Sequence, residues 1–141
     1  MLYGVCNLSI VPLRLEASDR SEMVSQVLYG EHFKVLEKRK NWSKIRLQHD
    51  SYEGYIDNKQ YVEITEDSYI QLTRTTTTIS GELIDFITNN KGGLSTICLG
   101  SSLPFYSDQK FEIDNSKYTF EGQVYHNILP KETILKTAFL Y

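Results

Sequence analysis

Short apolar runs alternate with polar or glycine-containing turns along the first 64 residues, a pattern typical of a closed antiparallel sheet. In residues 32–37, Phe33 and Val35 fall on one side of an extended strand, and in residues 42–47 Ile45 and Leu47 do the same. Ile45 and Leu47 are therefore predicted to be core residues. The pattern predicts one small β-barrel over residues 1–64.

A short helical connector is predicted over residues 65–74. Thr65 is suited to cap a helix, and Glu66 and Asp67 complement the positive helix end, so we expect about two helical turns over residues 66–72. The β-branched run at residues 75–78 disfavours any continuation of the helix.

A second β-rich unit is predicted over residues 75–129. Two hairpins are expected there, the first built from residues 83–87 and 94–99 and the second from residues 111–113 and 118–120. Residues 122–124 are predicted to close a second barrel. The predicted fold class is therefore mainly β, with two small β-barrels joined by a short helical connector.

The last twelve residues follow a helical rather than a strand pattern. Ile134, Leu135, Ala138 and Phe139 form an apolar stripe at helical spacing. We expect residues 130–141 to be the start of a truncated helix that leads to a further domain.

Charge and hydropathy disfavour several classes of function. The formal net charge of −3 and the lack of a dense basic stripe argue against nucleic-acid binding. No apolar run approaches the roughly 20 residues of a membrane helix. Residues 1–6 lack a basic leader, so a cytoplasmic location is expected.

The two cysteines offer little for catalysis. Cys6 and Cys98 either form a disulfide or remain reduced thiols, and the reduced state is favoured. A cysteine peptidase that pairs Cys6 with His32, His49 or His126 is the weakest hypothesis, because Cys6 lies within an expected strand. No cysteines or histidines fall at zinc-ligand spacing, so neither a metal nor another cofactor is predicted.

Carboxylates and aromatic side chains are the other candidate site residues. Acid–base chemistry by Asp50, Glu53 and Asp57 is disfavoured, because carboxylates clustered around a turn are usually solvated. Aromatic residues are better candidates, since aromatic surfaces between loops are common ligand-binding sites. The predicted groove residues are Tyr29, Trp42, Tyr52, Tyr55 and Tyr61. Packing inside the barrel is the alternative role for Trp42 and Tyr55.

The order of these features resembles the bacterial SH3 domain. The resemblance implies two small SH3-like β-barrels, the second of them more divergent. The chain as a whole resembles the non-catalytic N-terminal part of an NlpC-type cysteine peptidase of the murein-peptide endopeptidase group. The likeness is strongest over residues 3–14, in Trp42-Ser43-Lys44-Ile45-Arg46-Leu47 and in Gly54-Tyr55-Ile56-Asp57. In that family the nucleophile lies in an Asp-Cys-Ser-Gly segment, which is absent here. The resemblance therefore implies no catalytic residue in this chain.

What the resemblance implies instead is an accessory role. Such SH3 domains pack on the peptidase domain of the same polypeptide and restrict its substrate groove to short murein stem peptides with a free N-terminus. The expected partners are therefore that peptidase domain and stem peptides, with no nucleic acid and no membrane. The alternative is a stand-alone module that binds cell-wall peptide or another protein.

Overall fold

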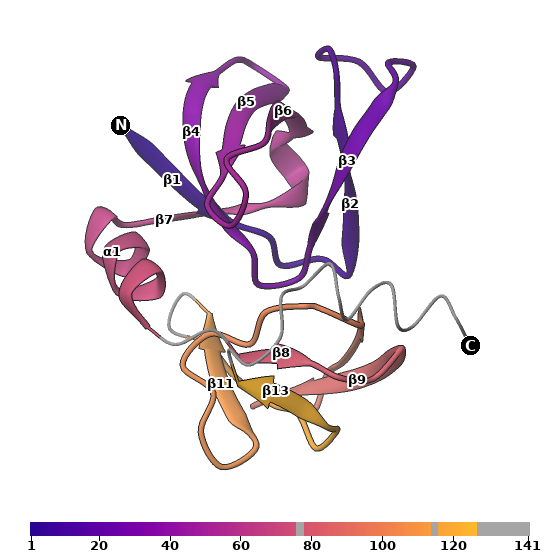
Figure 1. Cartoon of the computed structure of the whole chain (residues 1–141), viewed down its shortest axis with the longest axis vertical. Helices are drawn as coiled ribbons and strands as arrows, with labels where there is room; N and C mark the ends of the chain where they lie inside the picture. The colour runs from indigo at the N-terminus through magenta and orange to yellow at the C-terminus, as the bar shows by residue number, and fades with distance from the viewer. Residues whose placement is uncertain (76–77, 114–115, 127–141) are drawn as a thin grey trace.

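The computed structural model describes residues 1–75, 78–113 and 116–126, and this part of the chain is mainly β (Figure 1). A mainly β fold was predicted and is confirmed. The predicted truncated helix at residues 130–141, and residues 127–129 of the predicted second barrel, lie outside the described residues.

Within the described residues, seven strands of the first unit form one antiparallel sheet in the order β3-β2-β6-β5-β4-β1-β7. The strands are β1 (Leu2–Val5), β2 (Ile10–Arg14), β3 (Met23–Leu28), β4 (His32–Lys38), β5 (Trp42–Leu47), β6 (Glu53–Asp57) and β7 (Val62–Ile64). The first strand pairs with both β4 and β7, so the N-terminal strand lies inside the sheet. This sheet spans the residues of the first predicted barrel, 1–64.

The core of the barrel comes from the strand alternation that the sequence predicts. Phe33 and Val35 on β4 face Leu47 and Ile45 on β5 in the antiparallel register, and all four side chains are buried. Leu13 joins them from β2 in the same cluster. Because side chains alternate across a strand, the residues between them face outward.

Two short helical elements follow, and the second lies in the predicted connector. The 3₁₀ turn η1 (Asn58–Gln60) leads into β7, and helix α1 (Glu66–Arg74) comes after it. The Thr65 hydroxyl accepts a hydrogen bond from the Ser68 N–H at 3.1 Å, which confirms the predicted cap. Tyr69 packs the helix onto the barrel, with its ring centroid 4.5 Å from that of Tyr3. The helix ends two residues later than expected.

The second unit contains both predicted hairpins but a different closure. Its strands are β8 (Thr78–Ser80), β9 (Ile84–Asn89), β10 (Leu94–Cys98), β11 (Lys110–Ile113), β12 (Ser116–Thr119) and β13 (Val124–His126). A four-stranded sheet has the order β10-β9-β12-β11, while β13 pairs with β8 in a separate two-stranded ribbon. The described part of this unit is thus a sheet and a ribbon, and its classification as a second SH3-like barrel stays a prediction.

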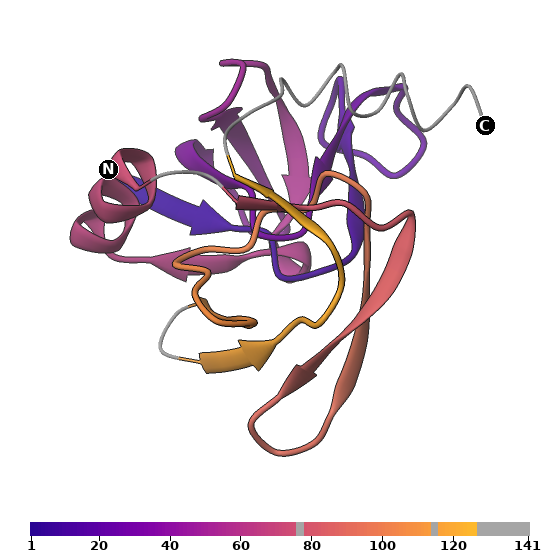
Figure 2. The same cartoon turned by 60° about the horizontal axis from the view of Figure 1, so that its bottom comes forward.

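The two units share buried apolar contacts, although the sequence pattern predicts two separately packed barrels. The second unit lies against one end of the barrel (Figures 1 and 2). Val5 and Tyr29 from the barrel belong to the same buried cluster as Ile87, Phe111 and other residues of the second unit. A barrel of this size has a small core of its own, so burial against a neighbour adds to its stability. The predicted domain boundary at residue 64 stays a prediction, because apolar contacts cross it.

Candidate ligand-binding face

Of the five aromatic residues predicted to bind ligand, Trp42 and Tyr55 come together on the outer face of β5 and β6. Trp42 faces Asp57 across the two strands and Tyr55 faces Lys44, so the two rings are diagonal neighbours on one side of the sheet. Both side chains are half-buried, between the barrel core and solvent. This pair is the centre of the candidate ligand-binding face.

Three cationic side chains surround Tyr55. Arg14 on β2 and Lys44 on β5 both face Tyr55 in the strand register. The Arg39 guanidinium lies over the ring, 5.1 Å from its centroid, and donates a hydrogen bond to the Tyr55 hydroxyl at 3.2 Å. An aromatic ring with cations beside it suits a flat or anionic group such as a peptide carboxylate.

Carboxylates on the same surface moderate this positive charge. Arg39 also donates to Glu37 at 2.9 Å, and this hydrogen bond is the main reason that the pKa of Glu37 is lowered and that of Arg39 raised. Lys44 lies 4.0 Å from the Glu53 carboxylate. Solvent-exposed ion pairs of this kind contribute little to stability. Ligand binding here would exchange these partners rather than fill an empty site.

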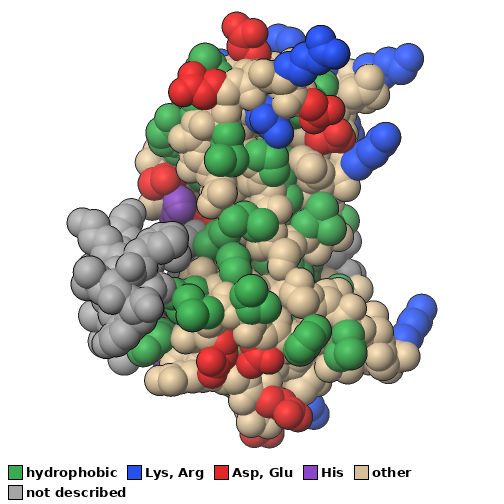
Figure 3. Space-filling view, turned by 90° about the vertical axis from the view of Figure 1, so that its right-hand side faces the viewer, with side chains coloured by type: hydrophobic (Ala, Val, Ile, Leu, Met, Phe, Trp, Pro, Cys, Tyr) green, Lys and Arg blue, Asp and Glu red, His purple; other side chains and the backbone are tan. Residues whose placement is uncertain are grey.

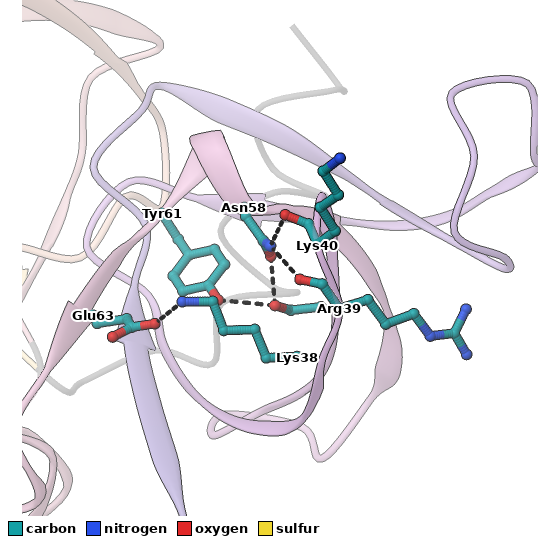
Figure 4. Close-up of polar contacts among 7 residues, drawn as sticks. Lys38, Arg39, Lys40, Asn58, Tyr61 and Glu63 are labelled. Atoms are coloured by element: carbon teal, nitrogen blue, oxygen red, sulfur yellow. Dashed lines mark hydrogen bonds and ion pairs between the residues drawn. The ribbon is translucent and has the colours of Figure 1, made fainter.

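A polar network holds the β4–β5 turn beside this face (Figure 4). The Asn58 side chain donates to the backbone carbonyls of Arg39 at 2.9 Å and of Lys40 at 3.3 Å. Lys38 forms an ion pair with Glu63 on β7. The basic residues 38–40 of this turn are solvent-exposed, and η1 fixes their backbone through Asn58.

Tyr52 lies away from the Trp42–Tyr55 pair. It is exposed in the turn between β5 and β6, where the Asp50 carboxylate accepts its backbone N–H at 3.0 Å. Trp42 begins β5 and Tyr52 follows the other end of the same hairpin. The prediction of a single groove containing both residues therefore stays a prediction.

Tyr29 and Tyr61 are buried and cannot line an exposed groove. The Tyr61 hydroxyl hydrogen-bonds the Ser43 hydroxyl at 2.9 Å, and its ring packs edge-on against Phe33 in the barrel core. The Tyr29 ring packs edge-on against Phe111 between the two units, and burial raises its pKa. Their assignment to a binding groove was wrong, because both rings supply bulk that the packed interior requires.

A buried carboxylate is the feature that sequence reasoning missed. Glu31 is 5% exposed, and its Oε1 accepts the Leu28 N–H at 2.7 Å. Its other oxygen lies 3.1 Å from Nε2 of His49. Glu31 directly follows the Tyr29-Gly30 turn, and this position is the only feature of the sequence that could have indicated its burial. These contacts assign Glu31 a structural role in holding the turn.

The hydrogen-bond contacts described for Cys6, Cys98, His32 and His126 are with residues of other types. The Cys6 side chain is buried in the barrel core, whereas Cys98 is a free cysteine whose Sγ lies 3.8 Å from the Ser101 hydroxyl. His32 contacts Thr73 at 3.1 Å, and His126 contacts Thr78 at 3.0 Å. A buried Cys6 lacks the partly exposed thiolate of a cysteine peptidase. The hypothesis of a self-contained enzyme gains no support.

The described residues contain neither a candidate metal cluster nor a helix able to span a membrane. Over residues 1–75, 78–113 and 116–126, no three or more side chains of histidine, cysteine, aspartate or glutamate gather in a way that could hold a metal ion. In the same part of the chain, no helix is both long and apolar enough to cross a membrane.

The first unit matches a known family. Residues 13–60 match the model of the bacterial dipeptidyl-peptidase SH3 domain. The first barrel is a bacterial SH3 domain. The match covers β2 to η1, including the β5 and β6 strands that carry the candidate ligand-binding face, and it confirms the resemblance stated from the sequence. Among curated proteins, none matches the chain.

A solved structure extends the likeness to both units. An NlpC/P60 family protein from Bacillus cereus ATCC 10987 superposes with a TM-score of 0.67 at 13% sequence identity. The superposition covers 88% of this chain and 56% of that one, so this chain spans little more than half of its structural relative. At this identity the likeness shows a shared fold. It is the fold expected from the resemblance to the SH3 region of NlpC-type peptidases.

Proposed function

We propose that this chain is the non-catalytic accessory region of a cysteine endopeptidase that cleaves murein peptides. In this role the SH3 domain and the second unit pack on a peptidase domain of the same polypeptide. They restrict its substrate groove to short stem peptides with a free N-terminus, in the cytoplasm. The match of the first barrel to the bacterial dipeptidyl-peptidase SH3 model is the observation that carries the proposal.

Two further observations support it. The structural relative is named as an NlpC/P60 protein, and the part it shares with this chain includes both units. The contacts of Cys98 are with serine groups, and Cys6 is buried, so neither thiol has the surroundings of a nucleophile.

An assay of γ-D-glutamyl bond cleavage tests the proposal. The reading frame is first sequenced past Tyr141, and the natural polypeptide is compared with the 141-residue chain on L-Ala-γ-D-Glu-diamino acid and on its N-acetylated form. Cleavage of only the free-amine peptide, and only by the longer polypeptide, is the expected result. Hydrolysis by the 141-residue chain that Cys98→Ser abolishes would overturn the proposal.

A stand-alone binding module is the second candidate function. The diagonal Trp42–Tyr55 pair with Arg39 over the Tyr55 ring favours it, because half-exposed aromatic and cationic side chains suit a peptide carboxylate. Calorimetric titration of the 141-residue chain with a stem peptide separates the two functions. Measurable affinity that Trp42→Ala removes and Tyr52→Ala leaves unchanged supports this second function.

A further inference from the structure

The outer face of the β9–β10 hairpin has the wrong polarity for a surface in contact with water. Side chains alternate across a strand, so β9 directs Ile87 into the core and Ile84 and Phe86 to the opposite side. Ile84 is 74% exposed and Phe86 is 57% exposed. An antiparallel sheet with one solvated face normally carries polar residues there.

The neighbouring strand continues this apolar surface. Phe86 faces Thr96 and Thr88 faces Leu94 in the register, so Leu94 lies on the same side as Phe86 and is also exposed. We call Ile84, Phe86 and Leu94 the apolar face. No lysine, arginine, aspartate or glutamate occupies this side of β9 or β10, whose other members are Thr88, Thr96 and Cys98.

The apolar surface continues onto the first barrel. The Ser9 hydroxyl donates to the backbone carbonyl of Thr96, and Cys98 Sγ lies 3.8 Å from the Ser9 carbonyl. These contacts bring Leu8 and Ile10, both exposed, beside β10. Figure 3 shows hydrophobic side chains gathered over the middle and lower part of one side of the molecule, whereas most lysine and arginine side chains lie above them. Contiguous apolar surface on this scale marks an interaction site.

We infer that the apolar face is the surface on which the peptidase domain of the same polypeptide packs, an inference that rests on the proposed function. A sheet face is covered by a second packed layer in folded domains, which suits a globular partner better than an extended peptide. The hairpin projects from the second unit, where such a layer can reach it (Figure 2). The structural relative contains a large region beyond the part shared with this chain, as a covering domain requires.

Hydroxyl-radical footprinting with mass spectrometry tests this inference. The natural polypeptide and the 141-residue chain are labelled in parallel, and modification is read at Phe86, Ile84 and Leu94. Leu15 in the β2–β3 loop is the matched reference, because it is 56% exposed against 57% for Phe86. The expected result is that the apolar face loses most of its modification in the natural polypeptide while Leu15 is modified equally in both proteins.

A pair of variants of the natural polypeptide adds a second measurement. Phe86→Glu places a charge in the contact and should restore the modification of Ile84 and Leu94, whereas Leu15→Glu should not. Circular dichroism confirms that both variants fold. If Phe86→Glu prevents folding, the comparison of the two unaltered proteins still decides the question.

The outcomes separate this inference from the proposed function. A natural polypeptide without a peptidase domain overturns both. A peptidase domain that is present while Phe86 stays equally modified overturns only the docking surface. Protection of Phe86 already in the 141-residue chain also overturns the docking surface. If this protection falls on dilution together with a dimer seen by light scattering, a second copy of the chain is the occupant. If the protection does not fall on dilution, the chain covers its own apolar face.

Discussion

The β5–β6 hairpin of the SH3 domain and the β9–β10 hairpin of the second unit are built alike but differ on their outer surfaces. Each directs fully buried side chains inward, Ile45 in the first and Ile87 in the second. Outside, the first carries Lys44, Arg46, Glu53 and Asp57, with Arg46 Nη2 and Glu53 Oε2 2.8 Å apart. The second carries only apolar or uncharged side chains there.

This difference shows that packing in the core determines the inward side chains, whereas contact with water or a partner determines the outward ones. The inward side chains satisfy the fold in the same way in both hairpins, since burial of apolar area stabilises each of them. The outward side chains are less constrained by core packing, so they are available for solubility or for contact with a partner. The outer side of the β5–β6 hairpin, the charged face, suits water or an anionic ligand, and the apolar face suits a protein surface.

A substitution at the contact between the two units should have the largest effect on stability. Gly30 has φ +81°, and a Cβ there would lie 1.9 Å from the Ser102 carbonyl oxygen. Ser102 N–H in turn donates to the Tyr29 carbonyl at 2.7 Å. Gly30→Ala should therefore lower the free energy of unfolding by about 3 kcal/mol or more, with both units unfolding together, as measured by urea denaturation.

Gly92→Ala is the matched control for Gly30→Ala. Gly92 has nearly the same φ, +83°, but a Cβ added to it in the β9–β10 turn would have no other atom within 4 Å. Only the backbone cost of a positive φ remains there, about 1 kcal/mol. Equal losses for the two variants would show that the contact with Ser102 is not what holds the units together.

Acid should destabilise the barrel through His32, an effect of intermediate size. Burial and the neighbouring His49 lower the pKa of His32 from 6.5 to about 4. Between these values the unfolded chain binds the proton and the folded chain does not, so stability is complete above pH 6.5 and is lost as the pH falls toward 4. The loss between pH 7 and pH 5 should be roughly 1–2 kcal/mol in urea denaturation, and His32→Gln should reduce it.

The outer faces themselves should give the smallest changes in stability. Phe86→Glu on the apolar face and Glu53→Gln on the charged face should each change the unfolding free energy of the 141-residue chain by less than about 0.5 kcal/mol. Phe86→Glu should in addition lower the binding of a hydrophobic dye such as ANS, and Glu53→Gln should not. A loss of several kcal/mol for Phe86→Glu would mean that this chain itself buries the ring.

The alternation of apolar and polar residues was the most reliable sequence feature for predicting the fold. Ile45 and Leu47 were predicted to be core residues and are buried, because a strand offers only two sides and one must be buried. Thr65 was recognised as a helix cap for an equally local reason. The β8–β13 ribbon was missed, since the partner of β8 lies more than forty residues along the chain.

The candidate site was harder to predict. Aromatic character alone does not distinguish the half-exposed Trp42 and Tyr55 from the buried Tyr29 and Tyr61, because the same ring serves in a core or on a surface. The buried Glu31 gave no signal, since its burial depends on the Leu28 N–H and on His49, eighteen residues away in sequence.

The sequence by itself determined the local elements, the inward side of each strand and the relationship of the first barrel to bacterial SH3 domains. These properties depend on neighbours along the chain, and the pattern of residues contains them. Only the tertiary structure decided that Tyr29 and Val5 pack into the second unit, that Gly30 contacts Ser102, and that Phe86 faces outward uncovered. Each of these depends on which distant segment occupies the space beside a side chain, and that is settled by packing in three dimensions.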